Sequence, residues 1–401
     1  MRWLFGAPQR CEVVIDAALR EVLRNAYFIE HVATVKKAGY LADTSVEIAT
    51  APEMLTYLNL VQASKCDRSK PSVLLYPDPP LGDEEVEVIE NLNPSNITVT
   101  TPTDIAMSSG LGTSGPPLKG RLIGLSISNS PDLSVHGMGL VHLEDAMVEC
   151  ARHLLAQGAS LVYGGDLRPG GFTTILFELV RSHNRAGAKE RIHNYLAWPI
   201  GLRIDPGIWH EYMDEIRDYR VSPPADLGVD PKVYVGPDRM PGRYLWSRSL
   251  TDMRTEMNGK TAARVLLGGQ VYGFKGKYPG ILEEALLGLR AKKPVYLIGG
   301  FGGCAAAIVE ALRGGVPSAF TGAFQSTDPL FADLAARYQT DAQEGKGSPI
   351  DYAGELKYLQ SVGIAGLNNG LTSVENEALA ASRNLPEVVY LLLKGLSQSL
   401  K

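Results

Sequence analysis

The chain has 401 residues, of which 45% are hydrophobic and 21% charged, an ordinary composition for a globular protein of two or three domains. Its net charge of -5 provides no basic field, so we expect neither nucleic acid nor an anionic membrane surface as a partner. The four cysteines form no CxxC pair, which argues against a disulfide framework and a metal site. No apolar stretch is long enough for a membrane span or a signal peptide, so we expect a cytoplasmic protein.

Residues 1–107 are predicted to form a small α/β module of unknown role, and residues 108–120 form a linker rich in glycine, serine and proline. The module combines a loose helical stripe of apolar residues with short apolar runs that predict strands. Its expected elements are a helix at 8–40, strands at 45–49, 72–76 and 97–101, and helices at 52–63 and 83–92.

Residues 121–315 are predicted to form a second domain. Apolar strands alternate with helices there, which indicates a Rossmann-like parallel sheet with helices on both faces. Residues 205–240 hold many prolines and predict an insertion with one helix at 208–219. Strands are expected at 122–127, 160–163, 195–200, 264–267 and 294–298, and helices at 143–157, 174–182, 250–258 and 304–312.

Residues 316–401 predict a mainly helical extension. Helices are expected at 352–362 and 385–398, and the sequence GLTSVEN suggests a capping box in which Thr372 or Ser373 begins a further helix.

Four polar or glycine-rich loops follow predicted strands, at 126–129, 164–173, 268–280 and 299–303. The carboxyl ends of parallel strands meet at one edge of a sheet, where open α/β sheets bind ligands. Glycine allows the backbone to approach a phosphate closely, and the N–H groups at a helix start favour an anion. The four loops together therefore predict a phosphate or ribose site.

Candidate contacts follow from side-chain chemistry. Arg168, Arg248, Arg254 and Lys277 are candidate phosphate partners, whereas Asp166, Glu283 and Glu284 are candidate acceptors for ribose hydroxyls. For Arg254 and Lys277 the alternative is a solvated surface cation, and for the two glutamates it is stabilisation of a helix N-terminus. The other candidate contacts are Ser126, Ser128, Gly164, Gly165, Gly171, Phe172, Thr173, Gly268, Gly269, Pro279, Gly280, Gly299, Gly300, Phe301, Gly302 and Gly303.

Other catalytic motifs are missing from the sequence. No G-x-G-x-x-G opens the second domain, and neither a P-loop nor a G-x-S-x-G elbow is present, so ordinary NAD binding, P-loop chemistry and the usual hydrolase are not indicated. His136 and His142 lie near the first loop, where a surface or packing role is the preferred interpretation.

Several stretches resemble the SLOG superfamily. They are LSIS at 125–128, LVYGGDLRPGGFT at 161–173, ARVLLGGQVYGFKGKYPGILEEALL at 263–287 and PVYLIGGFGG at 294–303. More narrowly, these stretches are similar to the prokaryotic branch related to the N-terminal region of melastatin-type transient-receptor-potential channels, and GLNNGLTSVEN at 366–376 is similar to it too. Over roughly residues 120–400, the resemblance implies a Rossmannoid fold that binds nucleotides, often ADP-ribose-like or cyclic ADP-ribose-like. In prokaryotes such domains resemble sensors of nucleotide signals in antiviral defence.

The same superfamily includes the lonely-guy phosphoribohydrolases, which cleave nucleoside monophosphates with an Arg and a Glu around a PGGxGTxxE segment. The similar stretch here, PGILEE at 279–284, keeps Pro-Gly and Glu-Glu but shortens the central GxGT. This departure favours binding over hydrolysis and leaves Glu283 and Glu284 as the candidate catalytic residues.

The leading hypothesis is a homo-oligomeric nucleotide sensor that needs no cofactor besides its ADP-ribose-like ligand. The alternatives are an enzyme that cleaves N-glycosidic bonds and a scaffold with a vestigial pocket.

Overall fold

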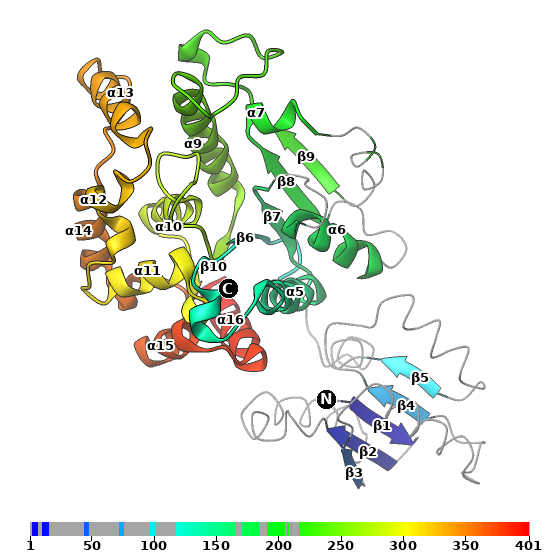
Figure 1. Cartoon of the computed structure of the whole chain (residues 1–401). Coiled ribbons are helices and arrows are strands. Elements are labelled where there is room, and N and C mark those ends of the chain that lie inside the picture. Colours follow the sequence, from blue (N-terminus) through cyan, green and yellow to red (C-terminus); the bar gives the residue numbers. More distant parts are fainter. Residues whose placement is uncertain are drawn as a thin grey trace. The chain divides into compact units, whose positions relative to one another are not determined.

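The computed structural model describes residues 118–165, 171–183, 191–204, 207, 210 and 216–400, and the backbone of five short strands before residue 101. The chain divides into two compact units, each with its own sheet (Figure 1). The predicted linker lies outside the described residues except for residues 118–120.

The first unit contains a five-stranded sheet in the order β3-β2-β1-β4-β5. β1 pairs antiparallel with β2 and β4, and the outer strands β3 and β5 pair parallel with their neighbours. The three expected strands are confirmed as β3, β4 and β5, whereas the helices expected at 52–63 and 83–92 lie outside the described residues. The strands are β1 (Arg2–Gly6), β2 (Arg10–Ile15), β3 (Thr44–Glu47), β4 (Ser72–Leu75) and β5 (Ile97–Thr100).

The helix expected at 8–40 is wrong over Arg10–Ile15, which forms strand β2. Its sequence RCEVVI ends in three consecutive β-branched residues, and such residues favour a strand over a helix.

The second unit contains a fully parallel six-stranded sheet in the order β11-β10-β6-β7-β8-β9. The chain starts in the middle at β6, proceeds outward to β9, and then returns to the other side of β6 as β10 and β11. The predicted Rossmann-like α/β fold is therefore confirmed. The strands are β6 (Leu122–Ser128), β7 (Ser160–Tyr163), β8 (Ile192–Leu196), β9 (Ile216–Arg220), β10 (Ala263–Gly268) and β11 (Val295–Ile298).

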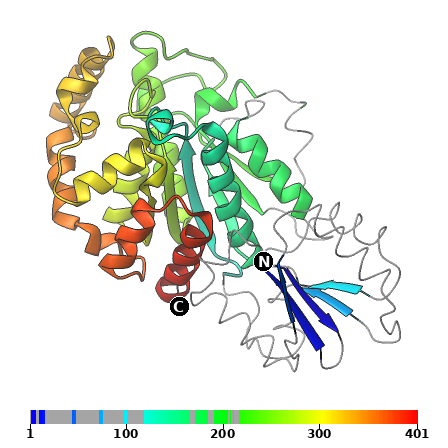
Figure 2. The same cartoon turned by 60° about the horizontal axis from the view of Figure 1, so that its bottom comes forward.

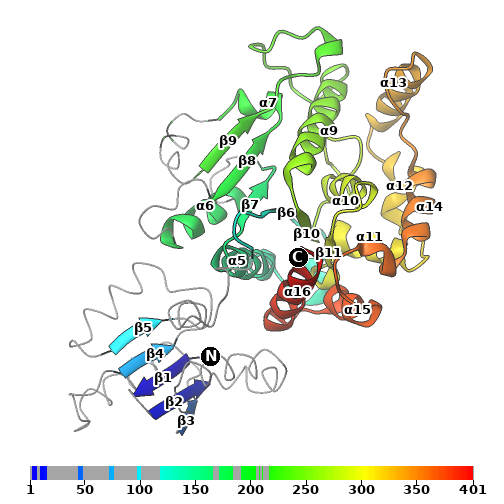
Figure 3. The ribbon, with the colours of Figure 1, turned by 180° about the vertical axis from the view of Figure 1, so that it is seen from behind.

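Helices cover both faces of this sheet (Figures 1 and 3). The right-handed crossovers from β6 to β8 place α5 (Leu140–Ala156) and α6 (Phe172–His183) on one face. The opposite winding places α9 (Gly242–Lys260) and α10 (Gly280–Arg290) on the other face. α11 (Gly303–Leu312) follows β11 and packs beside α10.

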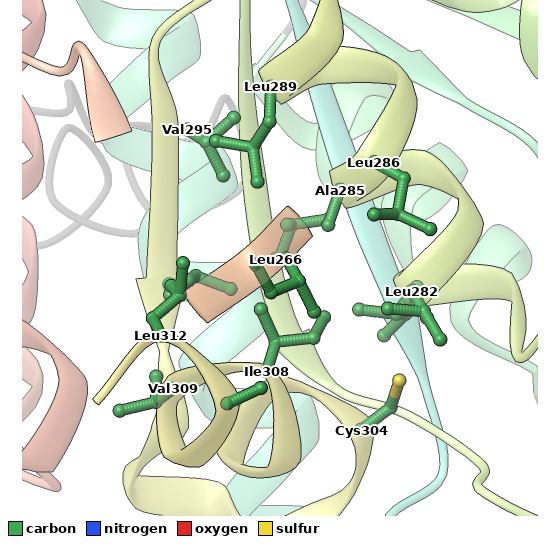
Figure 4. Close-up of a cluster of buried hydrophobic side chains, with 14 of the residues drawn as sticks. Leu266, Leu282, Ala285, Leu286, Leu289, Val295, Cys304, Ile308, Val309 and Leu312 are labelled. Atoms are coloured by element: carbon green, nitrogen blue, oxygen red, sulfur yellow. The ribbon is translucent and has the colours of Figure 1, made fainter. Parts of the chain in front are cut away.

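The core beside β10 is built by α10 and α11 (Figure 4). Leu266 of β10 packs between Leu282 of α10 and Ile308 of α11, and all three side chains are fully buried. Burying a leucine or isoleucine contributes about 1.5–3 kcal/mol. This cluster therefore fixes the start of α10, which carries Glu283 and Glu284, against the sheet.

Two elements expected from the sequence have different bounds in the structure, in the region of β8 and β9. The strand expected at 195–200 is β8, which begins at Ile192 and ends at Leu196. It ends there because Pro199 occupies the first turn of the short helix α7 (Trp198–Gly201), a position where proline is favoured. The helix expected at 208–219 is wrong at its end, because residues 216–219 belong to β9. Tyr219 of β9 stacks on Tyr195 of β8 with ring centroids 4.5 Å apart, a cross-strand contact that stabilises the pairing.

The C-terminal helices belong to the same compact unit as the parallel sheet. α14 packs on α11, and α15 packs on β11 (Figure 2). The Asn369 amide donates to the Val295 carbonyl at 2.8 Å, and this contact covers the outer edge of β11. The helices are α12 (Gly322–Gln325), α13 (Phe331–Gln343), α14 (Tyr352–Val362), α15 (Ser373–Ala381) and α16 (Leu385–Ser399), with short 3-10 turns at Leu133–His136, Ala225–Leu227, Gly299–Phe301, Ser318–Phe320 and Ile364–Leu367.

The predicted capping box is confirmed at the start of α15. The Glu375 N–H donates to Thr372 Oγ1 at 3.3 Å, and the Thr372 N–H donates to the Glu375 carboxylate at 2.9 Å. Hydrogen bonds from Lys394 and Thr372 lower the pKa of Glu375 to about 2.

We expect Thr372→Ala to lower the free energy of unfolding by about 1 kcal/mol, whereas Thr340→Ala on the exposed face of α13 should be neutral or slightly stabilising. Because the folded pKa of Glu375 is depressed, its contribution is present above its usual value of 4.5 and is lost as the pH falls towards 2. Urea unfolding of both variants at pH 7 and pH 3 measures these free energies of unfolding. An equal loss of unfolding free energy in the two variants at pH 7 would contradict the role of the capping box.

Candidate functional site

The parallel sheet has a switch point between β6 and β10, from which the chain winds in opposite directions. Open α/β sheets bind ligands in the crevice beyond such a point. Here the chain itself bridges the two strand ends: the Gly269 N–H donates to the Ser128 carbonyl at 2.9 Å, and the Gln270 N–H donates to Ser128 Oγ at 3.1 Å. Gly269 has a φ of 109° and a side chain there would meet Ile281, so this turn requires glycine.

The N-terminus of α11 also lies beyond this switch point, and an aspartate of the chain occupies it. The Gly303 N–H donates to Asp132 Oδ1 at 2.8 Å, and Ser130 Oγ donates to the same oxygen at 2.8 Å. Asp132 comes from the loop after β6 and lies close to Gly302. The sequence predicted that the Gly303 N–H would bind a phosphate. In the structure this N–H donates to the Asp132 carboxylate instead.

Gly299 and Gly300 lie against the end of α15. A side chain at Gly299 would come within 2.7 Å of the Ala380 carbonyl, and one at Gly300 would overlap the Ser382 backbone. The Gly300 carbonyl accepts from Arg383 Nε at 3.0 Å. These glycines, with the buried Phe301 beside them, allow two chain segments to pack closely.

The loop after β7 is described only in part. Gly164 lies against the sulfur of Met253 on α9, and Gly165 lies beside Thr173. Gly171 and Phe172 lead into α6, where Thr173 is buried. Asp166 and Arg168 lie outside the described residues, and their predicted ligand contacts stay predictions.

A buried ion pair joins β10, α10 and β6. Arg264 Nη1 donates to Glu284 Oε2 at 2.5 Å and to Ser126 Oγ at 3.0 Å, and Ser126 also donates to the Glu284 carboxylate. Arg264 is 1% exposed and Glu284 is 7% exposed. Burial lowers the pKa of Arg264, and the charge of Glu284 opposes that shift. Ser126 and Glu284 thus contact the Arg264 guanidinium within the core.

A second ion pair lies next to the first. Arg254 Nη1 of α9 donates to Glu283 Oε2 at 2.5 Å, and Thr251 Oγ1 donates to Glu283 Oε1 at 2.5 Å. Side chains at Gly276 or Gly280 would each come within 2.7 Å of the Arg254 guanidinium. The two glycines therefore make room for Arg254, and Pro279 between them is the N-cap residue of α10. Arg254 is a buried residue, so the surface-cation alternative is wrong for it.

A cavity of about 190 Å³ opens beside this second pair. It is bounded by α9, by the loop after β10, by α13 and by the segment that follows α13. Two of the predicted phosphate partners, Arg248 and Lys277, line it, and Thr251 links it to Glu283. The lining residues are Tyr244, Arg248, Thr251, Lys277, Tyr338, Asp341, Lys346, Gly347 and Ser348.

Arg248 and Lys277 are held differently in the cavity wall. Arg248 Nη2 contacts both oxygens of Asp226 at 3.0 Å, and its Nη1 donates to the Tyr244 hydroxyl at 2.8 Å. Lys277 Nζ instead donates to the Ser348 carbonyl at 2.9 Å and to Ser348 Oγ at 2.8 Å. Burial lowers the pKa of Lys277, and the charge of Glu283 opposes that shift.

The loop after β10 is anchored to the C-terminal helical region. Gln325 donates to the Val271 carbonyl at 3.0 Å, and the Tyr272 hydroxyl donates to the Thr327 carbonyl at 3.1 Å. The Asp351 N–H donates to the Tyr278 hydroxyl at 2.9 Å. With Lys277, these contacts hold the glycine-rich loop as one wall of the cavity.

Metal binding has no support in the described part of the chain, where no three His, Cys, Asp or Glu side chains gather as metal ligands would. Among the helices that the structure describes, none combines the length and the apolar character that crossing a bilayer requires.

A family model described as SLOG cluster2 matches residues 117–379. The chain belongs to this SLOG family. Comparison with curated proteins finds no match. The family match confirms the resemblance to the SLOG superfamily, and it extends through α12, α13, α14 and most of α15.

Sequence reasoning therefore located only part of the cavity of the SLOG domain. It predicted Arg248 and Lys277 but missed Tyr244, Thr251 and the residues after 330. One signal was available, because Tyr244, Arg248 and Thr251 are spaced four and three residues apart, on one face of α9. No local pattern indicates that Tyr338 and Ser348 line the same cavity.

We expect Glu284→Gln to lower the free energy of unfolding by about 3–5 kcal/mol, because it leaves the Arg264 charge buried without a partner. Glu310→Gln, on the exposed side of α11, should change it by less than about 0.5 kcal/mol. Replacing both partners, as Arg264→Met with Glu284→Leu, should recover much of the loss. Denaturant titration measures the free energy of unfolding of all three variants. A Glu284→Gln variant as stable as Glu310→Gln would contradict a stabilising role of the Arg264–Glu284 pair.

Proposed function

We propose that this SLOG domain is a nucleotide-binding sensor that recognises an ADP-ribose-like or cyclic nucleotide, in a prokaryotic defence or signalling system. SLOG membership supports a nucleotide-related function. The observation that carries the proposal is the cavity in which Arg248, Lys277 and two tyrosines meet. We further propose a cytoplasmic homo-oligomer, with no cofactor besides this ligand.

The chemistry of the cavity suits a nucleotide. Arginine and lysine bind phosphate oxygens through charge-assisted hydrogen bonds. The rings of Tyr244 and Tyr338 lie 5.2 Å apart at 69°, and aromatic faces of this kind pack against bases and sugars. The hydroxyls of Thr251 and Ser348 supply polar partners for a ribose.

The two glutamates favour binding over cleavage. Both Glu283 oxygens accept hydrogen bonds, from Thr251 and Arg254, and Glu284 is enclosed by Arg264 and Ser126. A general acid or base must reach the substrate and exchange a proton with it. Carboxylates held in this way stabilise the fold, which supports a sensor rather than a hydrolase.

We expect at least one of ADP-ribose, the cyclic ADP-ribose isomers, NAD and AMP to bind the full chain when titrated by calorimetry. Arg248→Gln should weaken that binding by about tenfold or more, the effect of losing a charge-assisted contact. Arg313→Gln is the matched control, because Arg313 forms an exposed ion pair with Glu377. If the wild-type chain binds none of them at high micromolar concentration, the sensor assignment is wrong, and a scaffold with a vestigial pocket becomes the better one. Light scattering on the same samples tests the homo-oligomer.

The second candidate function is cleavage of an N-glycosidic bond, favoured by Glu283 beside Arg254 at the start of α10. We expect no free base when the chain is incubated with AMP, NAD or ADP-ribose and the products are separated by chromatography. Release of base that Glu283→Gln abolishes, in a variant with an unchanged circular dichroism spectrum, would replace sensing with catalysis.

A further inference from the structure

We propose that the cavity lined by Lys277, Tyr338 and Ser348 is a phosphate-end subsite, which takes a phosphomonoester carried on a pentose-sized sugar. The inference rests on the proposed function and narrows its ligand to one with a terminal phosphate, as in AMP, because the phosphates of ADP-ribose, its cyclic isomers and NAD form a diphosphate bridge.

Charge in the cavity wall is the first argument. The cations that line the cavity or pair with its lining are Arg248, Lys277, Arg337 and Lys346, and the carboxylates are Asp226, Asp341 and Glu344. This set contains four cations and three carboxylates, so it has one more cation than carboxylate. Among the described residues, no carboxylate forms an ion pair with Lys277, although the charges of Glu283 and Glu355 act on it from beyond ion-pair distance.

The position of Lys277 is the second argument. Its ammonium has three donors, two of which bind the carbonyl and hydroxyl of Ser348, so one remains for a ligand. Its Nζ lies 5.1 Å from the centroid of the Tyr338 ring, which keeps the charge at the cavity wall. A half-buried cation without a carboxylate partner is costly, and an anion in the cavity would offset that cost.

The size of the cavity is the third argument. Pockets that enclose a whole drug-sized ligand measure about 300–1,000 Å³, whereas this cavity measures about 190 Å³. It is too small for an adenosine diphosphate moiety and suits one end of a ligand. A phosphomonoester carries a charge of about -1.5 to -2 at neutral pH, and this matches a wall with excess positive charge.

The polar and aromatic lining suits the sugar that would carry the phosphate. Thr251 and Tyr338 place hydroxyls on the side of α9 and α13, and the Tyr338 hydroxyl also contacts Ser247 Oγ at 2.8 Å. The Tyr244 and Tyr338 rings, packed edge to face, add apolar surface to the wall. A pentose offers an apolar ring face together with hydroxyls, so it complements both features.

The test is calorimetric titration of the full chain with four probes: ribose 5-phosphate, ribose, inorganic phosphate and riburonate. We expect ribose 5-phosphate to bind about tenfold or more tightly than ribose, the factor that one charge-assisted hydrogen bond provides. Riburonate, which carries a carboxylate at the C5 end in place of the phosphate, should also bind more weakly than ribose 5-phosphate. Equal binding of ribose and ribose 5-phosphate, tighter binding of riburonate, or no binding of ribose 5-phosphate at millimolar concentration would overturn the proposal.

Lys277→Met should weaken ribose 5-phosphate binding by about tenfold or more, whereas Lys357→Met, on the exposed side of α14, should leave it unchanged. Lys277→Gln removes the charge but keeps a donor for Ser348, and it replaces Lys277→Met if that variant fails to fold. Unchanged affinity in a folded Lys277 variant would overturn the proposal.

The two proposals fail in different ways. If AMP binds the wild-type chain and the Lys277 variants equally well, the nucleotide assignment holds and the subsite is wrong. If ribose 5-phosphate binds through Lys277 but no nucleotide binds, the subsite holds and the nucleotide assignment is wrong.

Discussion

The SLOG domain depends on the buried pair of Arg264 and Glu284. The pair joins a central strand to α10, and Ser126 connects both to β6. Taking two charges out of water is expensive, and removing either partner would leave the other charge buried and uncompensated. The start of α10 is therefore held at one place on the sheet, by this pair on one side and by the packing around Leu266 on the other.

The consequences extend from α10 into the loop that precedes it. Glu283 follows the same helix start and holds Arg254, whose guanidinium occupies the space left by Gly276 and Gly280. The rest of that loop is anchored to the C-terminal helical region through Gln325, Asp351 and Ser348. A glycine-rich loop fixed from both sides is a preformed wall. The cavity it borders is lined by α9, by this loop, by α13 and by the segment after α13, so a ligand bound there would contact both the loop and the C-terminal helical region.

Glycine after a strand has two physical uses, close approach of a ligand and close approach of another chain segment. In the described loops the second use accounts for Gly300, which packs on the Ser382 backbone, and for Gly302, which lies beside Asp132. Neither partner is near in sequence, so no local pattern separates the two uses. The predicted ligand contacts of these glycines stay predictions. Arg248 and Lys277 are the predicted residues that line the cavity beside α9.

The sequence by itself determined the features whose physical cause is local. The alternation of strands and helices determined the parallel sheet of the second unit, and the spacing of Thr372 and Glu375 determined the cap of α15. Only the tertiary structure decided that Ile216–Arg220 is a strand, because that depends on pairing with β8. It also decided that Glu283 and Glu284 are held by Arg254 and Arg264, and that Tyr338 and Ser348 complete the cavity. Contacts between residues tens of positions apart depend on packing, and packing leaves no period in the chain.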